Sequence, residues 1–349
     1  MNENDVSYNH SAYVKFINEL PQSTYQEINF IVINLGHKLG LTQISDLDVD
    51  STVKEGNITY PTDAKNLKTQ MLMIYECLKY FNINGYSSVV AFSLQFNLTK
   101  ALRDFKKYFF EKNKDKKMSI LQALAKRINI LIENALAAFE KINMSNIKWY
   151  ILRKLEKIQK YAKIYIKQVQ HFCRTGSACK NKILSFHIDN VAAIQKGKEH
   201  KKYEFGEVWQ VGRLDGNFCF GMFHENDLRY NDSTAIEDVV EKVMTNTDSI
   251  LKSITADRAY WSDENLEAAS AVGICEQGLH PKGRKPWPIT DTERVGELIN
   301  RRAGIEPLIG HLKRLGLGKS RMKTVVGTRA EGARSFIAFN IQKILSVLA

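Results

Sequence analysis

The sequence predicts an α/β domain with a mixed sheet, preceded by a mostly α-helical region. Three observations carry this prediction. Apolar residues recur at helical spacing over residues 64–175. From about residue 182, short alternating runs that are typical of strands replace them. Segments with helical spacing then follow or separate these runs up to the C-terminus, so strands and helices mix in one domain.

Composition narrows the class of protein. The chain has 349 residues, of which 44% are hydrophobic and 25% are charged, so it is expected to be globular rather than disordered. It has no apolar run of about 18 residues and no secretory signal at its start, which predicts no membrane span. The five scattered cysteines favour reduced thiols and a cytoplasmic location. The net charge of +12 favours a polyanionic partner, although solubility alone also explains it.

The helical half is expected to have two parts. Residues 1–115 read as a helical region, interrupted by a polar loop from Asp46 to Pro61. Residues 64–111 are compatible with a helix-turn-helix motif, but an ordinary helical bundle is favoured. Residues 116–178 predict a long helical hairpin with a basic outer face. That face could bind DNA backbone, pair two subunits or only be the solvated side of a bundle.

Residues 179–349 are expected to form the sheet-containing domain. Strands are predicted at residues 183–194, 203–214, 217–224 and 250–256, with Asp215-Gly216 as a hairpin turn. Helices are predicted at residues 233–246 and 261–272 and from 292 onward. Three strands, a helix, a strand and then helices is the order of a ribonuclease-H-like domain. Such a domain places an acid on its first strand beside one on its fourth strand.

Three acidic residues are candidates for one metal site. Asp189 and Asp257 lie in apolar runs that predict strands, and Glu306 lies in a helical pattern before Pro307. Carboxylate oxygens are the ligands that Mg²⁺ or Mn²⁺ prefers. Two such ions clamp the attacking and leaving oxygens of a phosphodiester. Each acid also has a structural interpretation: Asp189 on an exposed polar face, Asp257 as a turn former and Glu306 as a helix cap.

The chain resembles bacterial insertion-sequence transposases of the DDE type. The resemblance covers roughly residues 183–345. It rests on His187, Gln195-Lys-Gly-Lys198, Tyr203-Glu-Phe-Gly206, Ala256-Asp-Arg-Ala-Tyr260, Arg301-Arg-Ala-Gly-Ile-Glu-Pro-Leu-Ile-Gly-His-Leu-Lys313 and Ala338-Phe-Asn340.

The resemblance implies a ribonuclease-H-like catalytic domain, two bound Mg²⁺ or Mn²⁺ ions and binding to double-stranded DNA at transposon ends and target. It assigns Asp257 as the second acid and Glu306 as the third. The family often carries its first acid directly before the position of Val191, where this chain has Asn190. Asp189 is therefore the candidate for the first acid, with Asp215 and Asp232 as fallbacks.

Basic residues near the candidate acids are expected to contact DNA phosphates. Four lysines crowd one strand connection, and three more cations flank Glu306. The alternatives are a solvated turn for the lysines and pairing of the two arginines with Glu297 or Glu306. The expected contacts are Lys196, Lys198, Lys201, Lys202, Arg301, Arg302 and Lys313.

The sequence thus predicts a DNA transposase that hydrolyses the ends of an insertion sequence and transfers the strand into target DNA without a covalent enzyme intermediate. Residues 1 to about 175 would recognise the ends and pair them, which implies a homodimer in the end-paired complex. The expected location is the bacterial cytoplasm, at the nucleoid. The alternative is a sequence-specific DNA-binding protein that has lost catalysis.

Overall fold

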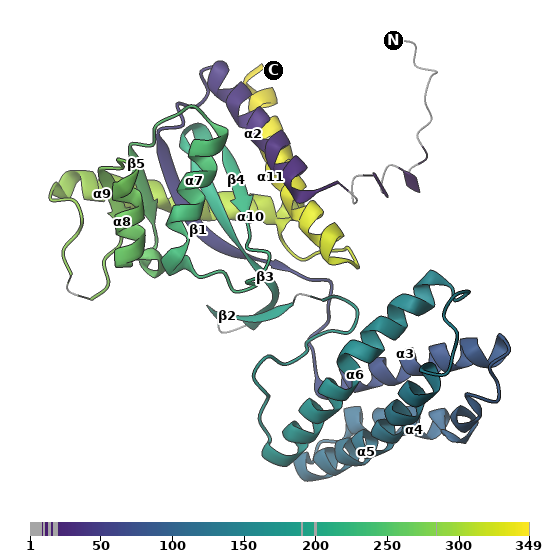
Figure 1. The fold of residues 1–349 in the computed structure, drawn as a ribbon. Helices are drawn as coiled ribbons and strands as arrows, with labels where there is room; N and C mark the ends of the chain where they lie inside the picture. The colour runs from purple at the N-terminus through teal and green to yellow at the C-terminus, as the bar shows by residue number, and fades with distance from the viewer. Residues whose placement is uncertain are drawn as a thin grey trace. The chain divides into compact units, whose positions relative to one another are not determined.

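The computed structural model describes residues 9, 11–12, 15–16, 20–189, 191–198, 201–283 and 285–348. Its contacts divide the chain into two compact units (Figure 1). The sheet unit contains residues 1–57 and 188–349, and the helical unit contains residues 58–187. The helical unit is therefore an insertion in the chain of the sheet unit. This division differs from the expected boundaries at residues 115 and 178.

One mixed sheet organises the sheet unit. Its strand order is β2-β3-β1-β5-β6, and β4 also pairs with β3. β1 runs antiparallel to β3 and parallel to β5, which in turn runs parallel to β6. The predicted ribonuclease-H-like α/β class is confirmed. The strands are β1 (Asp46–Glu55), β2 (Ala192–Lys198), β3 (Lys201–Leu214), β4 (Cys219–Met222), β5 (Ser253–Ala256) and β6 (Glu276–Leu279).

The central strand β1 lies where the sequence predicted a loop, so that prediction is wrong. Leu47 and Val49 are buried in one core, and Val53 is also buried, as a strand with period-2 alternation requires. The opposite face of β1 is polar, and its Asp48 and Lys54 are nevertheless buried because they form ion pairs. The polar residues made this segment look like a loop. The first predicted strand, residues 183–194, also begins too early, and β6 was missed.

Helices cover both faces of the sheet. α7 and α8 pack with β1 and β5 around Val49, Val240 and Ile254. α10 and α11 pack on the other face around Trp209 and Leu308. α2 lies beside α11, so the N- and C-terminal helices are neighbours (Figure 1). The bounds are α2 (Gln22–Lys38), α7 (Ile236–Asn246), α8 (Asp263–Ala271), α9 (Thr292–Ala303), α10 (Ile305–Leu312), the π-helical η5 (Lys313–Leu317) and α11 (Val325–Leu348).

The helical unit has one core of its own. α3 (Asp63–Ile83), α4 (Leu98–Phe110), α5 (Lys114–Phe139) and α6 (Trp149–Thr175) share it. The predicted apolar stripes of the α5–α6 hairpin are all buried in this core. Side-chain caps at Thr62, Asn97 and Asn113 begin α3, α4 and α5. Because α3 and α4 pack with α5 and α6, the expected boundary at residue 115 does not separate two domains. Across the described residues, no helix has both the length and the hydrophobicity needed to cross a bilayer.

A buried asparagine joins α2, β4 and α11 in the sheet unit. The amide nitrogen of Asn340 donates to Asn29 Oδ1 at 2.9 Å and to the carbonyl of Cys219 at 2.7 Å. The Asn340 side-chain oxygen accepts the N–H of Cys219 at 3.0 Å. Asn340 is fully buried, so these bonds satisfy groups that water does not reach.

We expect Asn340→Ala to lower the free energy of unfolding by about 1–3 kcal/mol, because it leaves the buried N–H of Cys219 without an acceptor. Urea unfolding followed by tryptophan fluorescence measures this change. Gln342→Ala, at an exposed position of the same helix, is the control and should change stability by less than about 0.5 kcal/mol. Equal effects of the two substitutions would contradict this role for Asn340.

Candidate active site

Two aspartates are neighbours at the carboxyl end of β5, where Asp257 follows that strand and Asp50 lies in the middle of β1. The register pairs Asp48 with Thr255 and Val49 with Ala256, so the next residues, Asp50 and Asp257, stand side by side. Neighbouring residues of paired strands project to the same face and their strands are about 4.8 Å apart. The sheet therefore brings together two acids that are 207 positions apart in the sequence.

Local backbone hydrogen bonds orient both carboxylates. Asp257 caps the short helix that follows β5, and its Oδ1 accepts the N–H of Ala259 at 2.7 Å. Oδ1 of Asp50 accepts the N–H of Ser51 at 2.7 Å. Both residues are half-buried. Each carboxylate is thus held in place while solvent still reaches its residue.

Glu306 lies on a helix that passes over the same face of β1. α9 ends at Ala303 and α10 begins at Ile305, so the predicted restart of the helix near Pro307 is confirmed. Ile305 and Leu308 are buried beneath α10, whereas Glu306 is exposed in its first turn. A carboxylate is favourable in the first turn, because the unpaired N–H groups there carry partial positive charge.

The chain from α9 to η5 runs along β1 in the same direction as the strand. At its start, Arg301 Nε donates to Asp48 Oδ1 at 2.8 Å. At its end, Lys54 Nζ donates to the carbonyl of Gly316 and forms an ion pair with Glu331 at 2.8 Å. α10 packs against β1 between these two attachments. The helix that carries Glu306 therefore packs against β1 between Asp48 and Lys54.

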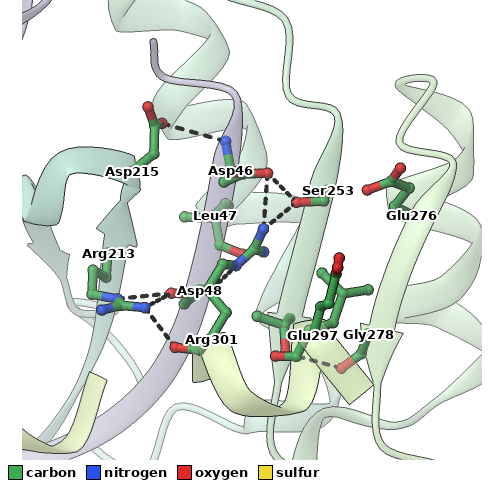
Figure 2. A network of polar contacts seen from close by, with 12 residues as sticks. Asp46, Leu47, Asp48, Arg213, Asp215, Ser253, Glu276, Gly278, Glu297 and Arg301 are labelled. Carbon is green, nitrogen blue, oxygen red and sulfur yellow. Dashed lines mark hydrogen bonds and ion pairs between the residues drawn. The ribbon is translucent and has the colours of Figure 1, made fainter. Parts of the chain in front are cut away.

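Arg301 is the centre of the ionic network that fixes the start of this segment (Figure 2). It bonds two carboxylates of β1, with Nη1 at 2.8 Å from Asp46 Oδ1 and Nε at 2.8 Å from Asp48 Oδ1. Nη1 also donates to Ser253 Oγ at 2.6 Å, which attaches α9 to β5. Arg213 Nε donates to the second oxygen of Asp48 at 2.7 Å. Asp48 is buried, and two guanidinium groups neutralise it.

The network requires a close approach of backbone at Gly304. Arg213 Nη2 donates to the carbonyl of Arg301 at 2.5 Å, just before the joint between α9 and α10. A Cβ atom at Gly304 would lie 2.1 Å from Arg213 Nη1. Glycine at this joint therefore allows the guanidinium to lie against the backbone that leads into Glu306.

On the opposite face of β1, Tyr260 lies near three carboxylates. Its buried hydroxyl donates to Gln210 Oε1, and Gln210 Nε2 donates to Asp232 Oδ1 at 3.0 Å. Burial raises the pKa of Tyr260 well above its usual value, and the negative charges of Asp232, Asp50 and Asp257 raise it further. Tyr260 therefore stays protonated at neutral pH and acts as a hydrogen-bond donor, not as a base.

In the structure, Asp189 does not have the position on a strand that the sequence suggested for the first acid. Asp189 precedes β2 and does not lie on a strand, so its expected place on the first strand is wrong. β2 is separated from β5 by β3 and β1, which puts these strands about 14 Å apart at the usual spacing. Asp215 instead accepts the N–H groups of Gln43 at 2.6 Å and Ser45 at 3.0 Å and so holds the loop before β1.

Sequence reasoning did not consider Asp50, the acid that the sheet places beside Asp257. Its signal was the alternation Leu47-Asp-Val-Asp-Ser-Thr-Val53, which has the period of a strand. Asp232 belongs to the network on the other face, where Ser51 Oγ donates to its Oδ2 at 3.2 Å.

The predicted DNA contacts have different surroundings. Lys196 and Lys198 lie in β2 and Lys201 in β3, but their side chains lie outside the described part of the structure. Lys202 is exposed, with its Nζ 5.8 Å from the ring centroid of Tyr203. Arg302 and Lys313 are half-buried. Arg301 is held by Asp46 and Asp48, which matches the alternative of carboxylate pairing, although with different carboxylates from those expected.

The acid pair suits a hard divalent cation. Carboxylate oxygens are the preferred ligands of Mg²⁺ and Mn²⁺, and two neighbouring negative charges are more stable when a cation lies between them. Within the described residues, no three His, Cys, Asp or Glu side chains are already grouped to hold a metal. Asp50 and Asp257 would therefore supply two ligands for such a cation, and Glu306 is not gathered with them in this structure.

We expect Arg301→Met to destabilise the attachment of α9 to β1 by about 1.5–3 kcal/mol, because hydrogen bonds to the buried carboxylate of Asp48 are lost. Hydrogen exchange at the amides of β1 and α10, read by mass spectrometry, measures the change locally. Arg302→Met, one position on and only half-buried, is the matched control. Similar acceleration of exchange by both substitutions would contradict the role assigned to Arg301.

Part of the sheet unit matches a known protein family. Residues 220–341 match the family model described as a transposase DDE domain, and this segment contains Asp257 and Glu306 but not β1. Searches among curated proteins and among solved structures gave no match. A transposase DDE domain implies transposase function, polynucleotidyl transfer and DNA binding. The predicted resemblance to DDE transposases is thus confirmed, through a transposase DDE domain over residues 220–341.

Proposed function

We propose that this chain is a DNA transposase whose catalytic carboxylates are Asp50, Asp257 and Glu306. It would cleave DNA at the ends of a mobile element and join the freed strand to target DNA. The observation that carries this proposal is the in-register placement of Asp50 beside Asp257, under the helix that bears Glu306. The insertion-sequence origin of the element stays a prediction from the sequence resemblance.

Asp50 is a better candidate for the first acid than Asp48. Asp48 is buried and forms ion pairs with Arg301 and Arg213, so its oxygens already have cationic partners. Asp50 is half-buried and stands in register with Asp257, which directly follows β5. Asp189 lacks this neighbour, since it precedes β2, a strand at the edge of the sheet.

Asp50, Asp257 and Glu306 would hold the divalent ions. Bound there, two such ions supply an activated water or 3′-hydroxyl and stabilise the leaving oxygen of the phosphodiester. The chain's own part is to position these ligands. The sheet fixes Asp50 and Asp257, while the Arg301 network sets the position of α10. Glu306 is exposed and flexible about three side-chain bonds, so a change of rotamer can bring its carboxylate toward the aspartates.

Joining two element ends requires two active sites held together, so we propose that at least two copies of the chain act in one complex. The alternative of a DNA-binding protein that has lost catalysis depended on the missing first acid. Asp50 provides a carboxylate at that place, and no observation on the described residues favours the alternative.

Asn or Gln substitution of each proposed acid tests the function. We expect Asp50→Asn, Asp257→Asn and Glu306→Gln each to reduce metal-dependent cleavage by more than about 100-fold. Loss of a direct metal ligand should reduce activity more than loss of a residue that only hydrogen-bonds to such a ligand. The assay is nicking, with Mg²⁺ or Mn²⁺, of a supercoiled plasmid that carries the coding sequence and its flanking DNA.

Asp189→Asn is the control and should cleave at the rate of the unmodified chain. EDTA should abolish all cleavage. If Asp50→Asn cleaves normally while Asp189→Asn is inactive, the assignment of the first acid is wrong. If the unmodified chain binds this DNA but never nicks it with either metal, the non-catalytic alternative replaces the proposal.

A further inference from the structure

The net positive charge of the chain comes from the helical unit. Residues 58–187 contain 24 Lys and Arg against 8 Asp and Glu, a net charge of +16. The remaining residues, which form the sheet unit, contain 26 Lys and Arg against 30 Asp and Glu, a net charge of −4. The electrostatic attraction for a polyanion therefore originates in the insertion and not in the unit that carries the candidate acids.

Within the insertion, α6 concentrates cations along one exposed stripe. Positions three and four apart share a helix face, and on this face every side chain is exposed. The opposite face of α6 is buried in the core of the unit through Leu155, Ile158 and Val169. The exposed stripe, which we term the α6 basic face, consists of Arg153, Glu156, Lys160, Lys163, Lys167 and Arg174, five cations and one acid.

The remaining cations of α6 have structural partners, which separates them from the basic face. Lys154 forms an ion pair with Glu76, and Lys157 donates to the backbone carbonyls of Phe186 at 3.2 Å and His187 at 2.7 Å. In contrast, Arg153, Lys163, Lys167 and Arg174 form no ion pair with an acid among the residues that the structure describes. Four charges of this face are thus uncompensated within the unit.

The length of this face matches duplex DNA. From Arg153 to Arg174 the helix rises about 32 Å at 1.5 Å per residue. One turn of B-DNA is about 34–36 Å long, so the face is long enough to reach phosphates on both sides of a groove. At its N-terminal end, Trp149 is 67% exposed and Arg153 lies 5.2 Å from its ring centroid. The exposed ring of Trp149 can contact a sugar while the guanidinium of Arg153 contacts the neighbouring phosphate.

We propose that the α6 basic face binds the sugar–phosphate backbone of double-stranded DNA and that the helical insertion supplies most of the chain's affinity for DNA. The choice of DNA as the polyanion rests on the proposed function. A second copy of the same face is a poor partner, because a symmetric contact would place five cations against five. Phosphate contacts position DNA without reading its sequence, so this face gives affinity and not specificity.

Charge removal on this face tests the proposal in the full-length chain. We expect the four-site variant Arg153→Gln, Lys163→Gln, Lys167→Gln, Arg174→Gln to lower the slope of log K against log salt by about 3–4, since each lost phosphate contact removes about 0.9. The probe is a fluorescent 40-base-pair duplex of the flanking DNA, measured by anisotropy in EDTA from 50 to 300 mM NaCl. All four positions are exposed, so circular dichroism should show unchanged helix content.

The matched control removes the same charge from the same unit at exposed positions away from this face: Lys65→Gln, Lys79→Gln, Lys126→Gln, Lys141→Gln. It should lower the slope by less than about 1. Equal loss in both variants, or a slope unchanged in the first, overturns the proposal. So does tighter binding of a duplex RNA of equal length, which would make RNA the partner. Because binding is measured in EDTA, the outcome is independent of cleavage: a chain that binds through α6 but does not nick DNA leaves this inference standing and removes only the proposed function.

Discussion

The pairing of β1 with β5 is the contact on which the candidate active site depends. In a parallel pair, residues in register lie side by side and project to the same face of the sheet. In this protein the register places Asp50, in the middle of β1, beside Asp257, which directly follows β5. The same strand β1 also carries Asp48 and Lys54, to which the segment containing Glu306 is attached. One strand therefore holds the proposed first acid, adjoins the proposed second acid and anchors the segment that carries the proposed third acid.

Buried charge on β1 explains how a polar strand can be central. Asp48 and Lys54 would each destabilise the fold strongly if they were unpaired in the interior. Arg301 and Arg213 neutralise Asp48, and Glu331 pairs with Lys54, whose pKa is lowered because burial disfavours its charged form. These ion pairs also connect segments that are distant in sequence. The polar face of β1 thus serves as an attachment surface for α9, η5 and α11, while its apolar face packs in the core.

The insertion separates two electrostatic demands that would conflict within one unit. A site built from carboxylates is favoured by a neutral or negative surrounding when it binds divalent cations. Affinity for a DNA backbone needs many cations. The chain places its positive charge in residues 58–187, which pack around their own core, and leaves the sheet unit slightly acidic. Inserting a compact unit directly after β1 is compatible with the fold because the insertion leaves the sheet at a strand end.

Sequence patterns alone determined the local features of this protein. The apolar stripes of α5 and α6, the Asp215-Gly216 turn, β3, α7 and the restart of the helix before Pro307 all follow from periodicity and turn chemistry within short windows. The mixed α/β class and the positions of Asp257 and Glu306 were also predictable, because strand and helix alternation and the family motif are contained in the last third of the chain.

Tertiary structure decided which acids meet. The composition of β1 is that of a loop. Its buried charged residues are stable in the interior only through Arg213, Arg301 and Glu331, which lie far away in the sequence. Asp50 becomes a candidate only when β1 is paired with β5, and Asp189 loses that role only when β2 is placed at the sheet edge. The reason is physical: strand pairing and buried ion pairs are long-range interactions, and no short stretch of sequence contains both of their partners.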